Sequence, residues 1–396
     1  MKIVRLETIR WQQQPHLLLL RVHTDTDLIG LGETYYLSGV VETVIHDLLA
    51  PFVLGQSVFD RELHWNAVFS RINNSGYAGA EMRALSALDI ALWDLLGQDA
   101  GQPLYNLLGG RCRERIRIYN TCVNAGARQD QTGFLETPAE LACSLFEQGI
   151  TAMKVWPWDR FAPPLPAGGI IGPAGRSVLG LTGTYISPQD VAAGLAVIGS
   201  IRDALGDRME ILIEGHGRWD LNTAVRIGRA LRPYDILWME DMIKPDCAAD
   251  LARLRAETGV PLCVSERLFT RYAYREILEA HAADVVMLDA VWTGGITESQ
   301  KIAILADAFH LPFTPHDCTG LVTVFANLHL CAACPNAMIL ETVRGFYEGW
   351  YREVYTDNIC IDRGFAEFPR KPGLGTGLRD DFLSRPDVAI RISQPC

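Results

Sequence analysis

Six short apolar runs, each ending in an acidic residue or a histidine, recur at a nearly constant spacing in this chain of 396 residues. The residues that end the runs are Glu214, Glu240, Glu266, Asp289, His316 and Glu341. The successive intervals are 26, 26, 23, 27 and 25 residues. Such an interval suits a short buried strand, a loop and a covering helix, because a parallel crossover takes a dozen or more residues. The spacing therefore predicts successive strands of a parallel sheet.

Two earlier segments extend this series toward the N-terminus. Residues 115–120 are predicted as the first strand, 141–148 as part of the first helix, and 151–156 as the second strand, which carries Lys154. In a (β/α) barrel the carboxyl ends of the strands gather on one face, and that face carries the chemistry. We therefore expect an α/β barrel over residues 116–355, with its polar residues on that face.

The first 115 residues have a different pattern. Residues 1–37 alternate apolar and polar, which is typical of an antiparallel meander with its first loop at 12–15. Residues 40–53, 58–73 and 80–97 have helical periodicity. We predict an α+β domain over 1–115, completed by the turn-rich tail 356–396, which is too short to fold alone.

One long irregular segment follows the second barrel strand. Residues 157–187 are rich in proline and glycine, and a loop of this length inside a compact domain is usually functional or disordered. Because it follows a barrel strand, it should overhang the catalytic face. We predict that it is a lid, with inert decoration as the alternative.

Composition narrows the class of protein. The net charge is −11, and the sequence has neither a run of basic residues nor aromatic residues interspersed with basic ones. We therefore expect no nucleic-acid partner. No apolar run approaches the ~18 residues of a membrane span, and the chain begins with a strand pattern rather than a signal peptide. The ten cysteines are scattered, so we predict reduced thiols in a cytoplasmic protein. The lone pair Cys331 and Cys334 has no second pair to support a zinc or redox site.

Three carboxylates end three consecutive predicted strands, namely Glu214, Glu240 and Glu266. Adjacent strands lie roughly 4.8 Å apart, so these carboxylates can converge on one point. Three like charges together are costly unless a cation neutralises them. Ligation by oxygen alone favours a hard divalent ion, most simply Mg²⁺.

Acid and base candidates lie on both sides of this predicted metal site. His316 and Asp289 end neighbouring strands, so the carboxylate can orient the imidazole as a general base. Lys154 and His216 lie on the other side, and Glu341 can hold a substrate oxygen or pair with a base. A packed core histidine is the alternative for His316, a fourth ligand or structural donor for His216, and simple charge neutralisation for Lys154. A metal flanked by two such groups suits removal of a proton α to a carboxylate.

Six further histidines carry no comparable pattern, and we predict ordinary structural or surface roles for them. They are His23, His46, His64, His281, His310 and His329.

Three motifs resemble the enolase superfamily, in its mandelate racemase branch. Residues 84–97 followed by 103–110 resemble the helix signature of its capping domain. Asp289 followed by 294–298 resembles its sixth-strand motif, and 372–375 its C-terminal turn. The resemblance covers nearly the whole chain and implies an α+β capping domain over a modified (β/α)7β barrel.

The same resemblance implies roles for the candidate residues. It makes Glu214, Glu240 and Glu266 the Mg²⁺ ligands. It pairs Asp289 with His316 as a dyad, makes Glu341 the eighth-strand carboxylate, and implies a homo-oligomer.

Two departures from the branch pattern bear on the reaction. The first metal position, commonly Asp, is Glu214, which is one methylene longer. The common Lys-x-Lys pair of the second strand is Lys154-Val-Trp156, which lacks the second lysine and argues against a two-base racemase. The Glu214-Gly-His216 pattern is similar to sugar-acid dehydratases, in which the histidine is the acid for the departing hydroxyl.

The sequence therefore predicts a Mg²⁺-dependent dehydratase of aldonates or aldarates that yields a 2-keto-3-deoxy acid. In this interpretation His316 takes the C2 proton, Mg²⁺ stabilises the enediolate, and His216 protonates the 3-hydroxyl. The nearest alternative is an epimerase or a lactone or anhydro-sugar cycloisomerase that uses Lys154 as second acid or base. Metal-assisted hydrolysis and a non-catalytic binding protein fit the residues less well.

Substrate identity is predicted to depend on four segments, residues 11–16, 35–36, 75–77 and 157–187. None of them has a motif that indicates a particular sugar acid.

Overall fold

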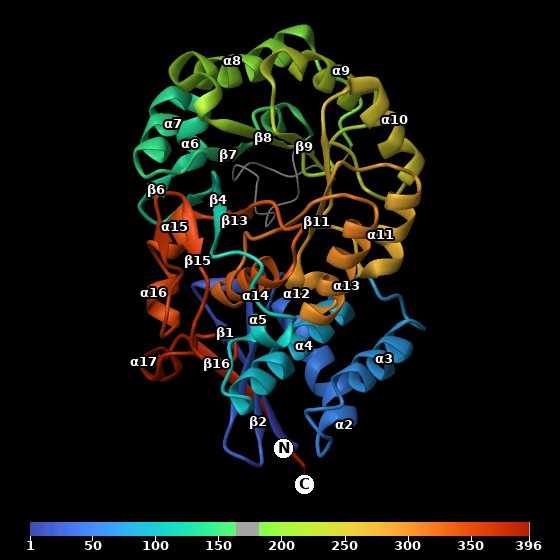
Figure 1. The fold of residues 1–396 in the computed structure, drawn as a ribbon, viewed down its shortest axis with the longest axis vertical. Helices are drawn as coiled ribbons and strands as arrows, with labels where there is room; N and C mark the ends of the chain where they lie inside the picture. Colours follow the sequence, from blue (N-terminus) through green and yellow to red (C-terminus); the bar gives the residue numbers. More distant parts are fainter. Residues whose placement is uncertain (164–181, 396) are drawn as a thin grey trace.

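The computed structural model describes residues 1–163 and 182–395. A ring of parallel strands surrounded by helices forms the larger part of the molecule, and the N-terminal elements lie against one side of it (Figure 1). The predicted class, an α/β barrel with an α+β N-terminal domain, is confirmed.

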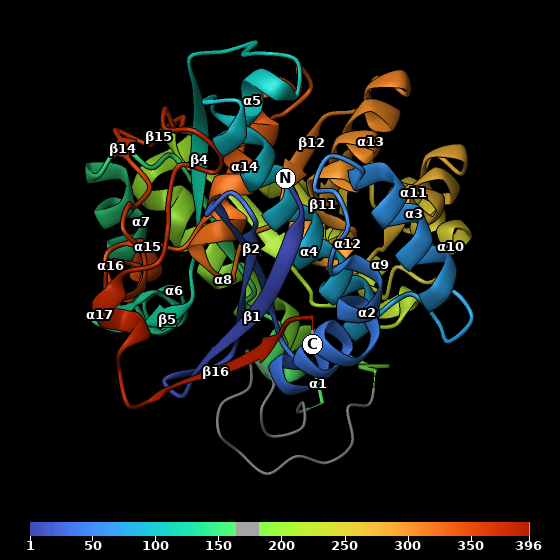
Figure 2. The same cartoon turned by 90° about the horizontal axis from the view of Figure 1, so that it is seen from below.

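The N-terminal sheet forms where the sequence alternates. Strands β1 (Ile3–Trp11), β2 (Gln14–Thr24) and β3 (Ile29–Tyr35) pair antiparallel. The first turn is tighter than predicted, since β2 already begins at Gln14, which pairs with Trp11. The fourth strand comes from the far end of the chain, because β16 (Val388–Ser393) pairs with β1 (Figure 2).

Helices cover one face of this sheet. Residues 38–53 form a continuous helical segment. It consists of α1 (Ser38–Thr43), the π-helix η1 (Val44–Leu49) and α2 (Ala50–Val53). Helices α3 (Arg61–Ile72) and α4 (Ala80–Asp99) follow, as the helical periodicity predicted. Helix α4 approaches β3 closely, since a Cβ at Gly30 would lie 2.1 Å from the Ala91 carbonyl oxygen.

Within residues 1–163 and 182–395, eight parallel strands close the barrel. They are β4 (Arg115–Thr121), β7 (Ala152–Val155), β8 (Glu210–Glu214), β9 (Trp238–Glu240), β10 (Leu262–Val264), β11 (Val285–Leu288), β12 (Phe313–Pro315) and β13 (Leu340–Thr342). Each pairs with the next from β4 to β12, β13 pairs with β4, and a bridge between Phe313 and Ala337 joins the last two. Apolar side chains including Tyr119, Leu212 and Trp238 fill the interior.

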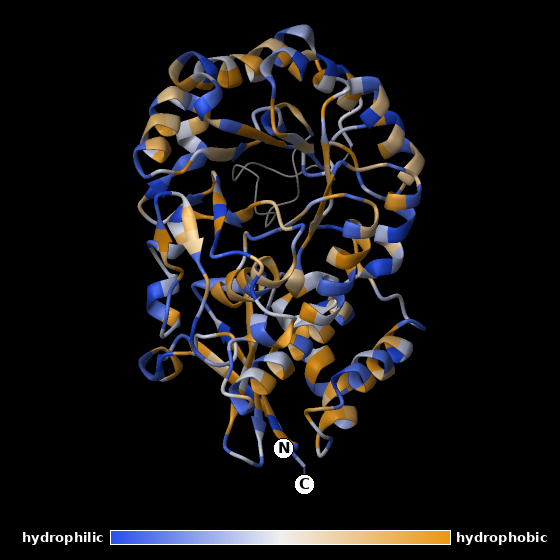
Figure 3. Cartoon of the chain, in the orientation of Figure 1, coloured by the Kyte–Doolittle hydropathy of each residue, from blue (hydrophilic) through white to orange (hydrophobic). Residues whose placement is uncertain are grey.

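Helical crossovers connect the strands, and hydrophilic and hydrophobic residues alternate along these outer helices (Figure 3). In chain order they are α6 (Asp130–Glu136) with α7 (Pro138–Glu147), α8 (Pro188–Leu205), α9 (Leu221–Leu231), α10 (Ala248–Thr258), α11 (Thr270–Glu279), α12 (Ala290–Thr293) with α13 (Gly295–Ala308), and α14 (Leu321–Ala333). In the described residues no helix is long and apolar enough to cross a membrane.

Short elements complete the chain. Helix α5 (Leu104–Leu107) and the hairpin of β5 (Asn124–Ala125) and β6 (Arg128–Gln129) flank β4, whereas α15 (Arg344–Tyr347) and α16 (Tyr351–Val354) follow β13. In the tail, β14 (Ile361–Asp362) pairs with β15 (Phe365–Glu367), which pairs with β4, and α17 (Asp380–Leu383) precedes β16. The tail thus contacts both the barrel and the N-terminal sheet.

Most of the segment predicted as a lid, residues 164–181, lies outside the described residues. The described start of the segment forms the short 3-10 helix η2 (Asp159–Phe161). Near its end, Gly183 bridges to Trp219, and Ser187 caps α8 through a hydrogen bond from the Asp190 amide.

Candidate metal and acid–base site

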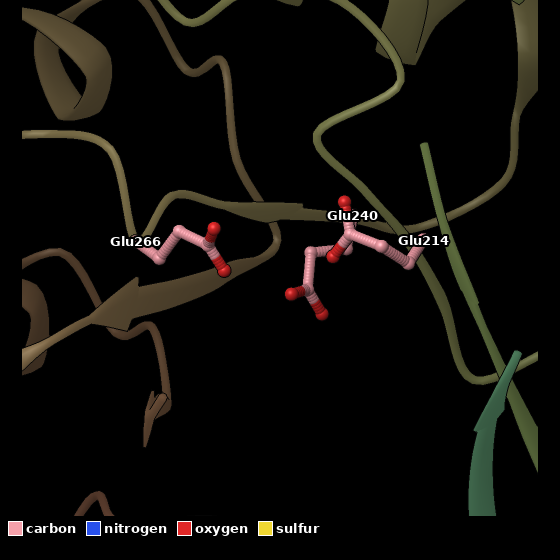
Figure 4. Close-up of side chains that lie close together, drawn as sticks. All are labelled: Glu214, Glu240 and Glu266. Atoms are coloured by element: carbon pink, nitrogen blue, oxygen red, sulfur yellow. The ribbon is translucent and has the colours of Figure 1, made fainter. Parts of the chain in front are cut away.

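The structure brings the three predicted metal ligands together at the carboxyl ends of three adjacent strands. Glu214 and Glu240 are the last residues of β8 and β9 and pair in register, whereas Glu266 lies two residues beyond β10. One carboxylate oxygen of each lies within 4.8 Å of the others, and all three residues are buried. The Glu266 carboxylate is turned toward the other two (Figure 4).

Electrostatics around this cluster fit a bound cation. Burial, and next the neighbouring Glu240, raise the pKa of Glu214 well above its usual value. Burial also disfavours the charged form of Glu266, but His316 and Arg267 outweigh it and lower its pKa to about 2. The raised pKa of Glu214 means that the neighbouring side chains supply too little positive charge to favour ionisation of this carboxyl. A donor set of carboxylate oxygens alone fits a hard divalent ion.

Lys154 lies inside the cluster rather than beside it. Its Nζ atom is 2.6 Å from Glu240 Oε1, 2.8 Å from Glu341 Oε1 and 3.7 Å from Glu214 Oε2. Burial alone would lower the pKa of this amine, but Glu240 and Glu341 outweigh it and raise the pKa well above its usual value. Lys154 is therefore a fixed positive charge in this structure.

Glu341 lies within β13 rather than at its end, and its two oxygens have separate partners. Oε1 accepts from the Thr121 hydroxyl as well as from Lys154, and Oε2 accepts from the Asp317 amide at 2.9 Å. Burial favours its neutral form, but Lys154 and His316 outweigh burial and lower its pKa.

His316 and Asp289 form the predicted pair. Asp289 Oδ2 lies 2.7 Å from His316 Nδ1, and Asp289 Oδ1 accepts from the Val291 amide, which fixes the carboxylate. The other ring nitrogen, Nε2, is 3.0 Å from Glu266 Oε2. Burial would lower the pKa of His316, but Glu266, Glu341 and Asp289 outweigh it and raise the pKa to about 10.

His216 has a carboxylate partner that the sequence analysis missed. Its Nδ1 atom lies 2.7 Å from Oδ2 of Asp159, which is on η2. The His216 amide also donates to Glu214 Oε1, so the backbone at His216 contacts a predicted metal ligand directly. The only available signal was an acidic residue three positions after Trp156, within a segment that had no decodable motif.

These groups line one cavity at the barrel mouth. Its lining residues are Tyr36, Thr121, Val123, Lys154, Trp156, Glu214, His216, Glu266, Trp292, His316, Cys318 and Glu341. Tyr36 comes from the N-terminal domain, and Arg83 of α4 lies 4.1 Å from the centre of the Trp292 ring. The N-terminal domain thus contributes to the wall of the barrel site.

Other predicted positions lie elsewhere. Tyr77 lines a separate pocket with Lys244 and Arg267, whereas His16 packs against Tyr36 at 5.4 Å between ring centres. Cys331 and Cys334 are free thiols near the end of α14, and Arg113 donates to both of their carbonyl oxygens.

The outlying histidines lie away from the barrel cavity. His23 pairs with Glu7, His46 with Thr8 and His64 with the Ser57 carbonyl. His281 and His310 are exposed, and His329 is buried in α14.

Two family models match this chain. The model described as "Enolase C-terminal domain-like" matches residues 138–382, and the one described as "Mandelate racemase / muconate lactonizing enzyme, N-terminal domain" matches residues 6–109. The chain belongs to the enolase superfamily, mandelate racemase branch. The domain limits at residues 115 and 355 and the roles of individual site residues stay predictions.

Relatives within the enolase superfamily include several dehydratases. The chain is 27% identical to D-xylonate dehydratase of Haloferax volcanii, over 92% of this chain and 84% of the relative. It is 30% identical to D-galactonate dehydratase of Ralstonia nicotianae, over 97% and 94%. A solved enolase of the mandelate racemase subgroup from Agrobacterium tumefaciens is 40% identical, with a TM-score of 0.88 over 100% of this chain and 99% of that one.

Within the enolase superfamily, these relatives indicate that the chain is a hydro-lyase. Members of this superfamily bind Mg²⁺ through acidic residues, and the buried glutamate cluster is compatible with such an ion.

Proposed function

We propose that this enzyme is a Mg²⁺-dependent acid-sugar dehydratase. It removes the proton α to the carboxylate of an aldonate or aldarate and eliminates the β-hydroxyl, which gives a 2-keto-3-deoxy acid. The observation that carries the proposal is that the imidazoles of His316 and His216 line one cavity together with two members of the buried glutamate cluster, Glu214 and Glu266. Elimination of water needs a base for the proton and an acid for the hydroxyl, and two separate imidazoles supply both.

Glu214, Glu240 and Glu266 would hold the ion. A bound Mg²⁺ supplies positive charge that favours loss of the proton next to the substrate carboxylate. The long Glu214 side chain serves in place of the Asp that is common at this position, because its carboxylate still reaches those of Glu240 and Glu266.

His316 acts as the base in this proposal. Asp289 occupies Nδ1, so in this proposal the C2 proton goes to Nε2, the nitrogen that lies 3.0 Å from Glu266 Oε2. A pKa of about 10 would keep the imidazole protonated, and the nearby Glu266 is the carboxylate that raises this pKa most. When the charge of Glu266 is offset, the pKa of His316 falls toward the range in which a neutral imidazole accepts a proton.

His216 acts as the acid, and Lys154 with Glu341 positions or neutralises the substrate carboxylate. Lys154 is held by two carboxylates and its pKa is raised, which disfavours a neutral amine that could serve as the second base of an epimerase. The names of the sugar-acid dehydratases among the relatives also support elimination over epimerisation or cycloisomerisation.

The test is a screen of a stereochemically complete set of aldonates and aldarates with Mg²⁺. Semicarbazide detects 2-keto acids, and incubation in D₂O read by NMR detects exchange at C2. We expect a 2-keto acid from at least one sugar acid. Exchange without a keto acid would redirect the assignment to an epimerase or cycloisomerase, and silence in both assays would contradict the substrate class.

A variant identifies the base. His316→Asn should lose both C2 exchange and keto-acid formation, because the amide cannot accept the proton. Full dehydration by this variant would contradict the role of His316.

A further inference from the structure

The imidazole of His216 is held as firmly as that of His316, but by a residue of the loop after the second barrel strand. Asp159 Oδ2 lies 2.7 Å from Nδ1 of His216; Asp159 is buried, and the His216 side chain is 11% exposed. The Trp156 ring packs edge-on against the imidazole, with 5.5 Å between ring centres and 80° between planes. A hydrogen bond and an aromatic contact therefore fix the ring orientation together.

Arg218 fixes Asp159 in turn. Its Nη1 atom donates to the Asp159 carbonyl oxygen at 3.0 Å and lies 3.6 Å from Asp159 Oδ2, and its Nη2 atom donates to the Ala162 carbonyl oxygen at 3.5 Å. The guanidinium, itself buried, thus holds the turn from 159 to 162 and offsets the Asp159 charge. Because Arg218 restricts the position of Asp159, Asp159 can in turn keep the His216 ring in one orientation.

The contact of Nδ1 with Asp159 decides which atom of His216 is available for chemistry. Because Nδ1 is occupied and His216 lines the cavity, Nε2 is the ring nitrogen left for a substrate. His316 has the same arrangement, with Nδ1 on Asp289. Two imidazoles, each held at Nδ1 by a carboxylate, thus line the same cavity.

We infer that Asp159 is the positioning residue for the acid half of the reaction, as Asp289 is for the base half. This inference rests on the proposed dehydration. The C2–H bond breaks and its proton goes to His316 Nε2, while the electron pair forms the C2–C3 double bond. The C3–O bond breaks as His216 Nε2 gives its proton to the departing hydroxyl, which leaves as water. The resulting enol loses the proton of its C2 hydroxyl and gains one at C3, which gives the 2-keto-3-deoxy acid. The carboxylate of Asp159 accepts the hydrogen bond from Nδ1–H throughout, so the ring keeps one orientation and Nε2 is the nitrogen that gives the proton.

The test separates the two halves of the reaction in one variant. Asp159→Asn keeps the size of the side chain but replaces the carboxylate oxygen that lies against His216 Nδ1 with an amide, which loosens the hold on the ring. We expect keto-acid formation to fall on the order of 100-fold in kcat, since general acid catalysis contributes about that much or more. Exchange of the C2 proton in D₂O, the KM and the Mg²⁺ affinity should stay within about twofold, because His316 and the glutamates do not contact Asp159.

Two matched variants show whether Asp159 acts through His216. Asp289→Asn should lose exchange as well as elimination. In a His216→Gln background, Asp159→Asn should cause no further loss, because residues that act as a unit are not additive. Asp159→Glu, which keeps the charge, should retain more elimination than Asp159→Asn.

The outcomes are distinct. Unchanged keto-acid formation by Asp159→Asn, or equal loss of exchange, elimination and Mg²⁺ affinity, would overturn the positioning role. An additive loss in the His216→Gln background would do the same. Failure of the wild-type enzyme to dehydrate any sugar acid would instead contradict the proposed function itself.

Discussion

The ammonium group of Lys154 lies 2.6 Å from Glu240 Oε1, and this ion pair is buried at the centre of the carboxylate cluster. The same ammonium reaches Glu341 Oε1 at 2.8 Å. One lysine therefore supplies positive charge to a group of carboxylates that would otherwise repel one another. A divalent ion held by the cluster would add to this positive charge.

Replacing Lys154 by Met should make the protein depend on Mg²⁺ for stability. Loss of one partner from a buried ion pair typically costs about 3–5 kcal/mol, so the metal-free variant should be destabilised by that order. Because the remaining site is more negative, Mg²⁺ should bind more tightly and raise the Tm more than in the wild-type protein. Thermal unfolding with EDTA and with Mg²⁺, together with calorimetric Mg²⁺ titration, measures both effects.

Lys301→Met is the matched control, because Lys301 pairs with Glu62 at the surface. Exposed pairs contribute about 1 kcal/mol or less. An equal Mg²⁺ effect on the Tm of the Lys154→Met and wild-type proteins would show that Lys154 does not share the site with the ion.

His329 should make the protein acid-sensitive. Its Nε2 atom donates to the Leu374 carbonyl oxygen at 2.9 Å, and Nδ1 accepts from the Tyr105 amide at 3.2 Å, so only the neutral ring satisfies both. Burial lowers its pKa from 6.5 to about 4. The unfolded chain then binds the proton more readily, so the contribution of His329 is complete above pH 6.5 and is lost as the pH falls through 4.

The expected loss is about 3 kcal/mol in the free energy of unfolding, from the difference between those two pKa values. Denaturant unfolding at several pH values should show that the gap between wild type and His329→Gln shrinks by this amount from pH 7 to pH 4. His310→Gln, at an exposed histidine, is the control. A gap that stays constant with pH would contradict the neutral buried imidazole.

Gly30→Ala should destabilise the N-terminal domain. The added Cβ would lie 2.1 Å from the Ala91 carbonyl oxygen of α4 and 2.7 Å from the Leu95 side chain, so strand and helix must move apart. Overpacking of this kind costs about 1–3 kcal/mol. Gly199→Ala, in the interior of α8, is the control, because its nearest neighbouring atom is 3.8 Å away and alanine favours helix. Equal denaturation midpoints for Gly30→Ala and wild type would contradict this packing.

Some of the site was predictable from the sequence because it depends on local periodicity. The regular interval places Glu214, Glu240 and Glu266 at or just beyond the ends of three adjacent strands, and parallel strands align their ends at one edge. The pair of Asp289 and His316 followed from the same rule. The regular interval did not predict where each strand ends to the exact residue. Glu266 lies two residues beyond β10, and Glu341 lies inside β13.

By itself, the sequence determined the strand–helix period, the fold class and the sets of polar residues that share the catalytic face, because burial along the chain dictates where each strand begins and ends. Only the tertiary structure decided which side chains meet. Asp159 reaches His216 across 57 residues, and Arg218 holds the turn that carries it. The last strand of the N-terminal sheet comes from Val388–Ser393, more than 370 residues after its partner β1. Such contacts depend on the path of loops and on the docking of domains, which no local pattern of apolar and polar residues specifies.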